Sequence, residues 1–116
     1  MVEQRIFNLL PNTFKKVIGD LPGTHDNSVA IILFNGAGND EYFGFQTVYR
    51  PIVKIVVRNK SYEVAQQWVN QIKQALHKHK DDYFLSILLQ GYPLYLGKSE
   101  QKLHEFQIVF NIQVKE

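Results

Sequence analysis

The chain has 116 residues, of which 45% are hydrophobic and 21% charged, and this predicts one globular domain spanning residues 1–116. It contains no cysteine, which excludes disulfides and thiolate metal sites. The formal net charge is +2, and its basic and acidic residues are interspersed, whereas a dedicated nucleic-acid-binding protein usually concentrates its positive charge in a patch.

The first segment, Glu3 to Ile18, is expected to form a helix that is broken near Pro11. Phe14, Val17 and Ile18 stand three and four residues apart, which is a helical spacing. Polar residues interrupt the first ten positions, so we expect no signal peptide.

Ser28 to Phe34 is predicted to be a buried strand, because it is apolar on both faces and bounded by turn residues. Its apolar run is far shorter than the roughly 20 residues of a membrane-spanning helix, so no membrane partner is expected. Loops are predicted on either side, at Asp20 to Asn27 and at the glycine-rich Asn35 to Phe45. The aromatic residues of the second loop either form a partner surface or fold back on their own core, and they are Tyr42, Phe43 and Phe45.

Val48 to Arg58 is predicted to be a second strand with one core face and one mixed face. Pro51 lacks an N–H group, so its end of the strand should lie at an edge or a bulge. The core face would carry Val53, Ile55 and Val57, and the mixed face Arg50, Ile52, Lys54, Val56 and Arg58.

Ser61 to His79 is the clearest predicted helix, with Ser61 as its N-cap. Its apolar stripe comprises Val64, Trp68, Ile72, Ala75 and Leu76, flanked by Ala65 and Val69.

Three extended segments follow: Tyr83 to Gln90, Leu94 to Leu96 and Lys102 to Val114. The last one alternates strictly, with His104, Phe106, Ile108, Phe110, Ile112 and Val114 on one face. The order α-β-β-α-β-β-β predicts an α+β fold. Its sheet would have four to five strands, mostly antiparallel or mixed, with two helices packed on one face.

No catalytic, cofactor-binding or metal site is predicted. Gly97-Lys98-Ser99 lacks the spacing and the following helix of a phosphate-binding loop, and Gly36-Ala37-Gly38 lacks those of a dinucleotide fingerprint. His77 and His79 point apart on the predicted helix, which argues against a shared metal. His104 is expected to be a partly buried structural residue. An active site without a local motif stays possible, because catalytic residues need only meet in space.

The order of several segments resembles the small minor capsid proteins of tailed phages and prophages of Gram-positive bacteria, and through them the tail-terminator or tail-completion proteins. The resemblance covers nearly the whole chain. It departs from the family pattern at Ser99 and Lys102, where relatives often carry an acidic residue and an arginine. The segments are Leu21-Pro22, Val29 to Gly36, Tyr49 to Arg58, Ser61 to Ala65, Gln90 to Gly97, Glu100 and Glu105-Phe106.

This resemblance implies a structural virion protein and not an enzyme, with no cofactor. The subunit would form a ring, expected to be a hexamer, that caps the tail tube at the head–tail junction. Its partners would be further copies of itself, the major tail tube protein and the head–tail connector proteins. DNA would pass through the lumen transiently, and the subunit would stay in the host cytoplasm before assembly.

Two groups of residues are candidates for these contacts. The subunit-interface candidates are Asn35, Gly36, Gly38, Tyr42, Phe43, Phe45, Arg50, Lys54 and Arg58. Lys15 and Lys16, together with Arg50, Lys54 and Arg58, could line the lumen, or they could be ordinary solvated charges. Three other functions stay open: a head-completion or neck protein of the same particle, a small ligand-binding or enzymatic domain, and a regulatory binding module with a partner outside the particle.

Overall fold

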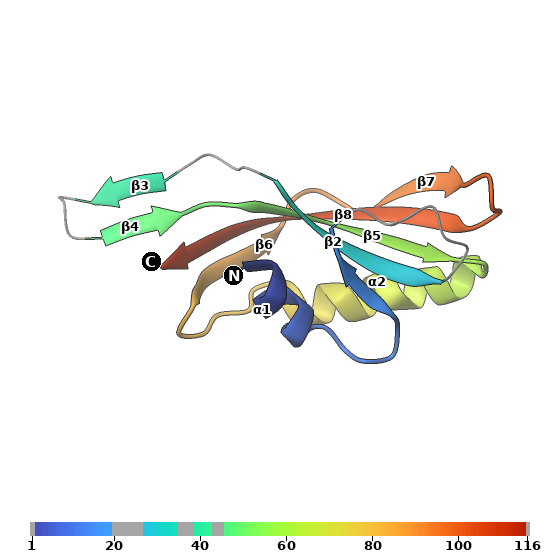
Figure 1. Cartoon of the computed structure of the whole chain (residues 1–116), viewed down its shortest axis with the longest axis horizontal. Coiled ribbons are helices and arrows are strands. Elements are labelled where there is room, and N and C mark those ends of the chain that lie inside the picture. Colours follow the sequence, from blue (N-terminus) through green and yellow to red (C-terminus); the bar gives the residue numbers. More distant parts are fainter. Residues whose placement is uncertain (1, 20–26, 35–38, 43–45, 116) are drawn as a thin grey trace.

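The computed structural model describes residues 2–19, 27–34, 39–42 and 46–115. Two helices lie on the same side of one sheet (Figure 1). The elements are α1 (Val2–Leu9), β1 (Lys16–Ile18), β2 (Ser28–Phe34), β3 (Asn39–Tyr42), β4 (Gln46–Tyr49), β5 (Ile52–Asn59), α2 (Tyr62–Leu76), β6 (Phe84–Leu89), β7 (Leu94–Lys98) and β8 (His104–Lys115).

The long strand β8 lies at the centre of the sheet. It pairs antiparallel with β5 and β4 along one edge, and with β6 and β7 along the other. Beyond β5 come β2, which is antiparallel, and β1, which is parallel; beyond β4 comes β3. The predicted α+β class and mostly antiparallel sheet are confirmed, although the described residues form eight strand segments, more than the four to five expected.

The hydrophobic core lies between the helices and the sheet. Every second residue of β5 and β8 points into it, as the alternation in the sequence predicted. Burial of one large apolar side chain stabilises the folded state by about 1.5–3 kcal/mol relative to leaving that side chain in water. The largest fully buried side chains are Phe84, Phe110, Ile6, Ile31, Ile55, Ile72, Leu76, Ile87, Leu103, Ile108, Ile112 and Val29.

Helix α2 begins where the sequence predicted. The Ser61 hydroxyl accepts a hydrogen bond from the Val64 backbone N–H at 3.3 Å, which satisfies one donor of the first turn. The centre of the buried stripe differs from the prediction, because Trp68 is only partly buried and packs against Phe14 with ring centroids 5.2 Å apart. The fully buried positions are Ala65, Val69, Ile72 and Leu76.

The prediction of a helix through Ile18 is wrong for its second half. Helix α1 ends at Leu9, and Lys16–Ile18 forms strand β1 beside β2. The backbone N–H of Gly19 donates to the carbonyl of Ile31 at 2.8 Å, with φ +95° at Gly19. A glycine in the left-handed region therefore ends a strand here. The spacing of Phe14, Val17 and Ile18 covers too short a segment to distinguish a helix from a strand.

Two further predictions need correction. Val48 to Arg58 is not one strand, because the chain breaks at Arg50-Pro51 and forms β4 and β5 in succession along β8. The Pro51 carbonyl still accepts a hydrogen bond from the Ile112 backbone N–H at 3.0 Å, so the chain remains bonded to β8 at the break. Within the predicted loop Asn35 to Phe45, residues Asn39–Tyr42 form β3, an antiparallel partner of β4.

The turn between α2 and β6 is organised by Asp81. One carboxylate oxygen accepts from the backbone N–H groups of Tyr83 and Phe84, both at 2.8 Å, and the other lies 2.7 Å from His79 Nε2. These hydrogen bonds, the one from Phe84 first, lower the pKa of Asp81 from 3.8 to about 2.

Phe110→Ala should lower the free energy of unfolding by about 3–5 kcal/mol, because the ring is fully buried at the centre of β8 and its loss leaves a cavity. Chemical denaturation followed by circular dichroism measures this. Gln67→Ala, on the exposed side of α2, is the matched control and should change little. If Phe110→Ala lowers the free energy of unfolding by only about 0.5 kcal/mol, as an ordinary surface substitution does, the assignment of Phe110 to the core is wrong.

Asp81→Ala should lower the free energy of unfolding by about 1 kcal/mol at pH 7, because two backbone donors lose their acceptor. Asp81→Asn keeps an acceptor oxygen and should lower it less. Since the folded pKa lies below the unfolded value, the stabilisation by the charged form is present above about pH 4 and is lost as the pH falls towards 2. Denaturation curves of both variants between pH 2 and 7 should converge with those of the parent protein at the acid end; a constant difference would exclude this linkage.

Candidate functional site

The sheet face directed away from the helices is called the open face from here on. It is formed by the side chains of several strands that point away from the core. In β5 it carries Ile52, Lys54, Val56 and Arg58, because the intervening residues point into the core. The strand register adds Ala30, Ile32 and Phe34 from β2, Glu105, Gln107, Val109 and Asn111 from β8, Leu88 from β6, and Leu94 and Leu96 from β7.

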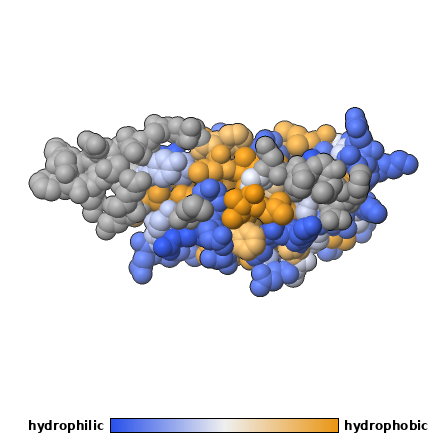
Figure 2. All heavy atoms as spheres, viewed as in Figure 1, coloured by the Kyte–Doolittle hydropathy of each residue, from blue (hydrophilic) through white to orange (hydrophobic). Residues whose placement is uncertain are grey.

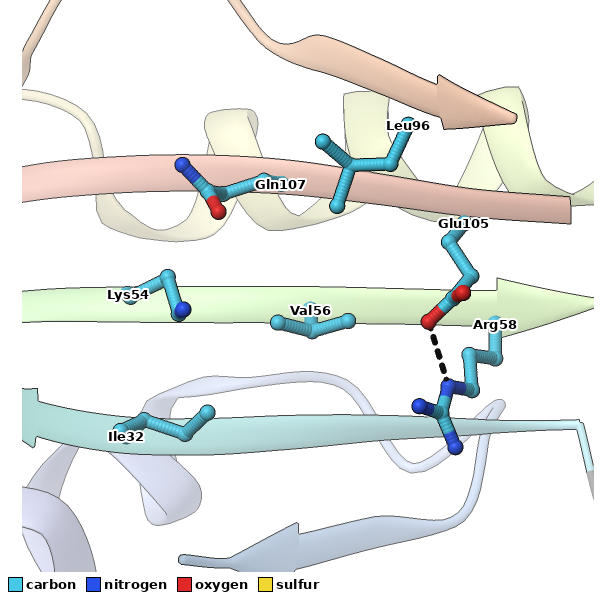
Figure 3. Close-up of a pocket in the computed structure, with 7 residues that line it drawn as sticks. All are labelled: Ile32, Lys54, Val56, Arg58, Leu96, Glu105 and Gln107. Atoms are coloured by element: carbon cyan, nitrogen blue, oxygen red, sulfur yellow. Dashed lines mark hydrogen bonds and ion pairs between the residues drawn. The ribbon is translucent and has the colours of Figure 1, made fainter. Parts of the chain in front are cut away.

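A shallow hollow of about 440 Å³ lies in the middle of the open face (Figure 3). Four neighbouring strands form it, each supplying side chains that project from the same face. Apolar side chains line its sides, with Lys54 towards one end and Arg58 and Glu105 at the other (Figure 3). The residues around it are Ile32, Lys54, Val56, Arg58, Leu96, Glu105 and Gln107.

One ion pair lies at one end of the hollow. Arg58 Nε donates to Glu105 Oε2 at 2.7 Å, and each side chain is only 19% exposed (Figure 3). The two residues are direct partners in the β5–β8 register, so the strand pairing itself brings them together. This pairing leaves the two charges balanced.

Lys54 is the other charged residue of the hollow. Its ammonium lies 5.2 Å from the centre of the Phe34 ring, and within the described ranges no carboxylate is found bonded to it. A cation over an aromatic face is weakly stabilised. The hollow therefore presents one uncompensated positive charge among apolar side chains.

Large apolar side chains surround the hollow and remain exposed to water. Phe34, Leu88, Leu94 and Leu96 are between 41% and 54% exposed. Figure 2 shows apolar atoms in the middle of the molecule, framed by hydrophilic atoms along the helical side and at the end opposite β3 and β4. Large apolar side chains exposed together on one sheet face are typical of a surface that another protein covers.

The structure brings two of the predicted interface residues together, since Lys54 and Arg58 both line the hollow. Arg50 lies apart from them, at the break between β4 and β5, where it lines a second hollow with Pro51 and Asn111. Tyr42 belongs to β3. Asn35, Gly36, Gly38, Phe43 and Phe45 lie outside the described residues.

The sequence pattern does not predict that Leu96 and Phe34 are exposed. It predicts only a short extended segment at Leu94 to Leu96 and, at Ser28 to Phe34, a strand that is buried on both faces. Glu105 could have been found, because it falls on the polar side of the alternation in β8, opposite a strand that carries Arg58.

An aromatic cluster occupies a different place, between α2 and β7. The Tyr62 ring lies 5.2 Å from Tyr95, 5.5 Å from His104 and 5.4 Å from Phe106, measured between centroids. His104 Nδ1 lies 2.7 Å from the Tyr95 hydroxyl oxygen and the residue is partly buried, in keeping with the structural role expected of it. Tyr92 stands beside the cluster and is 92% exposed.

Lys16, a predicted lumen residue, is engaged within its own subunit. Its ammonium donates to the carbonyls of Phe7 and Leu10, at 2.9 and 3.1 Å, and to Asn12 Oδ1 at 3.1 Å. A cation at the C-terminal end of α1 complements the helix dipole there. Lys15 precedes it at the start of β1, with its backbone carbonyl bonded to the Val29 N–H.

The described parts of the chain contain no group of three or more His, Asp or Glu residues placed to hold a metal ion. His77 Nδ1 instead accepts from the Leu89 backbone N–H at 3.0 Å. Neither of the two described helices is long and apolar enough to cross a lipid bilayer.

Comparison with known proteins shows one matching family and similar solved structures, one of which is described here. A family model described as bacteriophage tail terminator protein matches residues 6–116. The fold is similar to a chain from the virion of a native gene transfer agent particle, with a TM-score of 0.59 and 11% sequence identity, covering 96% of this chain and 92% of that chain. At this identity the likeness concerns the fold alone. No curated protein sequence matches the chain.

The Arg58–Glu105 pair should contribute a coupling energy of about 1 kcal/mol to the isolated protein, between the values of exposed and buried pairs. A double-mutant cycle with Arg58→Met and Glu105→Gln, read by chemical denaturation, measures it. Raising the salt concentration should reduce the coupling only slightly, because both side chains are mostly buried. If the effects of the two single substitutions on the free energy of unfolding simply add, the two side chains are not coupled and the ion pair does not stabilise the fold.

Proposed function

Because the chain belongs to the bacteriophage tail terminator protein family, which its sequence matches over residues 6–116, we propose that copies of it form a ring that caps the tail tube. It is a structural protein of the phage tail. In the proposed role the ring stops tube growth and offers a surface to the head–tail connector, at the tail end or the head–tail junction of the virion. The ring is proposed to be a hexamer.

The open face is the observation that carries this proposal. It presents exposed apolar side chains around a hollow with a single ion pair, and it lacks a cluster of converging polar groups among its lining residues. Catalytic and ligand sites usually contain several polar groups that converge on one point. The face is therefore suited to burial against another protein subunit, and we propose that the protein acts without catalysis and without a cofactor.

The shape of the subunit supports a ring. Its principal extents are 51 × 23 × 22 Å, and β3 and β4 lie at one end of the long axis (Figure 1). A head-to-tail ring needs two different contact surfaces on each subunit. The end that carries β3 and β4 and the open face are two such surfaces, and they include Tyr42, Lys54 and Arg58 among the interface candidates.

DNA passing through the lumen would meet this protein only transiently. Lys15, Arg50, Lys54 and Arg58 stay proposals for a lumen lining, with ordinary solvated charge as the alternative. The internal hydrogen bonds of Lys16 favour a structural role for that residue.

Deleting the gene from the phage should yield tails of uncontrolled length without attached heads, because nothing would stop the tube. Negative-stain electron microscopy of lysates measures tail length and head attachment, and a plasmid copy of the gene is the control. A head-completion or neck protein would instead leave tails of normal length beside tailless heads. Normal particles with joined heads and tails would remove the structural role altogether.

A further inference from the structure

Strands β3 and β4 form an arm, defined here as residues 39–42 and 46–49, that extends beyond the helices (Figure 1). Among the described strands, β3 pairs only with β4, and β4 reaches the rest of the sheet through Val48 and Tyr49, which pair with the last residues of β8. A two-stranded ribbon on its own is marginally stable in water. The arm therefore gains most from a surface that lies outside its own subunit.

The arm is acidic. It contains Asp40 and Glu41, and the stretch from residue 39 to residue 49 has no lysine, arginine or histidine. Both acidic residues belong to β3. The arm therefore brings negative charge, and no positive charge, to a partner surface.

The open face carries the complementary chemistry. Arg58 and Glu105 neutralise each other at one end of the hollow, which leaves Lys54 as the charge that the hollow offers. Exposed apolar side chains flank it on either side, in β2 and β7. A short acidic ribbon would cover those apolar side chains and place a carboxylate against Lys54.

The arm cannot reach the open face of its own subunit. It is hydrogen-bonded into the same sheet, as a continuation along β8, so it lies beside that face and not over it. A second copy has no such restriction. Because the arm and the open face are different surfaces of one chain, repeated contacts of this kind run head to tail, and they form a ring when the rotation between successive copies closes.

We propose that the open face of each subunit receives the acidic arm of the neighbouring copy, with Lys54 facing Asp40 or Glu41. The inference rests on the proposed ring and specifies the contact that builds it. Leu96 and Phe34 lose their exposure to water in this contact, and the Arg58–Glu105 pair forms its far edge.

Disulfide trapping in assembled tails tests the contact, because the natural chain has no cysteine. Leu96→Cys on the open face is combined with Asp40→Cys or with Glu41→Cys on the arm, so that both acidic positions are sampled. After mild oxidation, non-reducing gels of purified tails should show a ladder of covalent multimers for at least one combination. Single variants, and arm variants combined with Gln67→Cys on the exposed side of α2, should stay monomeric.

A charge exchange provides the second measurement. Lys54→Glu should reduce the yield of infectious particles by about tenfold or more, because two like charges then meet in the contact. Adding Asp40→Lys or Glu41→Lys should restore most of the yield.

The outcomes separate the contact from the ring itself. If the protein is present in tails but neither combination cross-links, and neither reversal restores the yield, the proposed contact is wrong while the ring stands. If the unmodified protein is absent from purified tails, the proposed function fails, and the inference fails with it.

Discussion

Strand β8 is the constraint on which the rest of the structure depends. It is hydrogen-bonded along both edges, to β5 and β4 on one side and to β6 and β7 on the other. Its strict alternation sends one set of residues into the core under the helices and the other set to the open face. A register shift by one residue would exchange the two faces. The core and the candidate interface are therefore fixed by the same pattern.

That pattern explains how much could be read from the sequence. Helix α2, strand β2 and strand β8 were predicted because each carries a long and unambiguous pattern or cap, such as Ser61 before α2. Strand β1 was missed because three residues are too few to separate a strand from a helix. Strand β3 was missed because Asn39–Tyr42 is polar and has no alternation, so only its pairing with β4 defines it.

The candidate site divides in the same way. Lys54 and Arg58 were predicted on the mixed side of their strand, and the structure places both in the hollow. The surrounding apolar rim could not be predicted, because the exposure of Phe34 and Leu96 depends on which strands border β2 and β8. A local pattern gives the face to which a residue belongs, whereas neighbouring strands decide whether that face is covered. Membership of the tail terminator family is the reason why we propose that another protein subunit covers this exposed surface.

The position of β8 in the chain has a consequence for synthesis. Strand β8, which joins both halves of the sheet, is translated after all of its partners. Strands β4, β5, β6 and β7 therefore leave the ribosome before the neighbour that they share. The pairing of β2 with β5 can form earlier, but the sheet closes only when β8 arrives. Pairings between segments distant in sequence also slow folding. During that interval the nascent chain exposes unpaired strand edges and apolar faces, which are the features that make incompletely folded chains prone to aggregation.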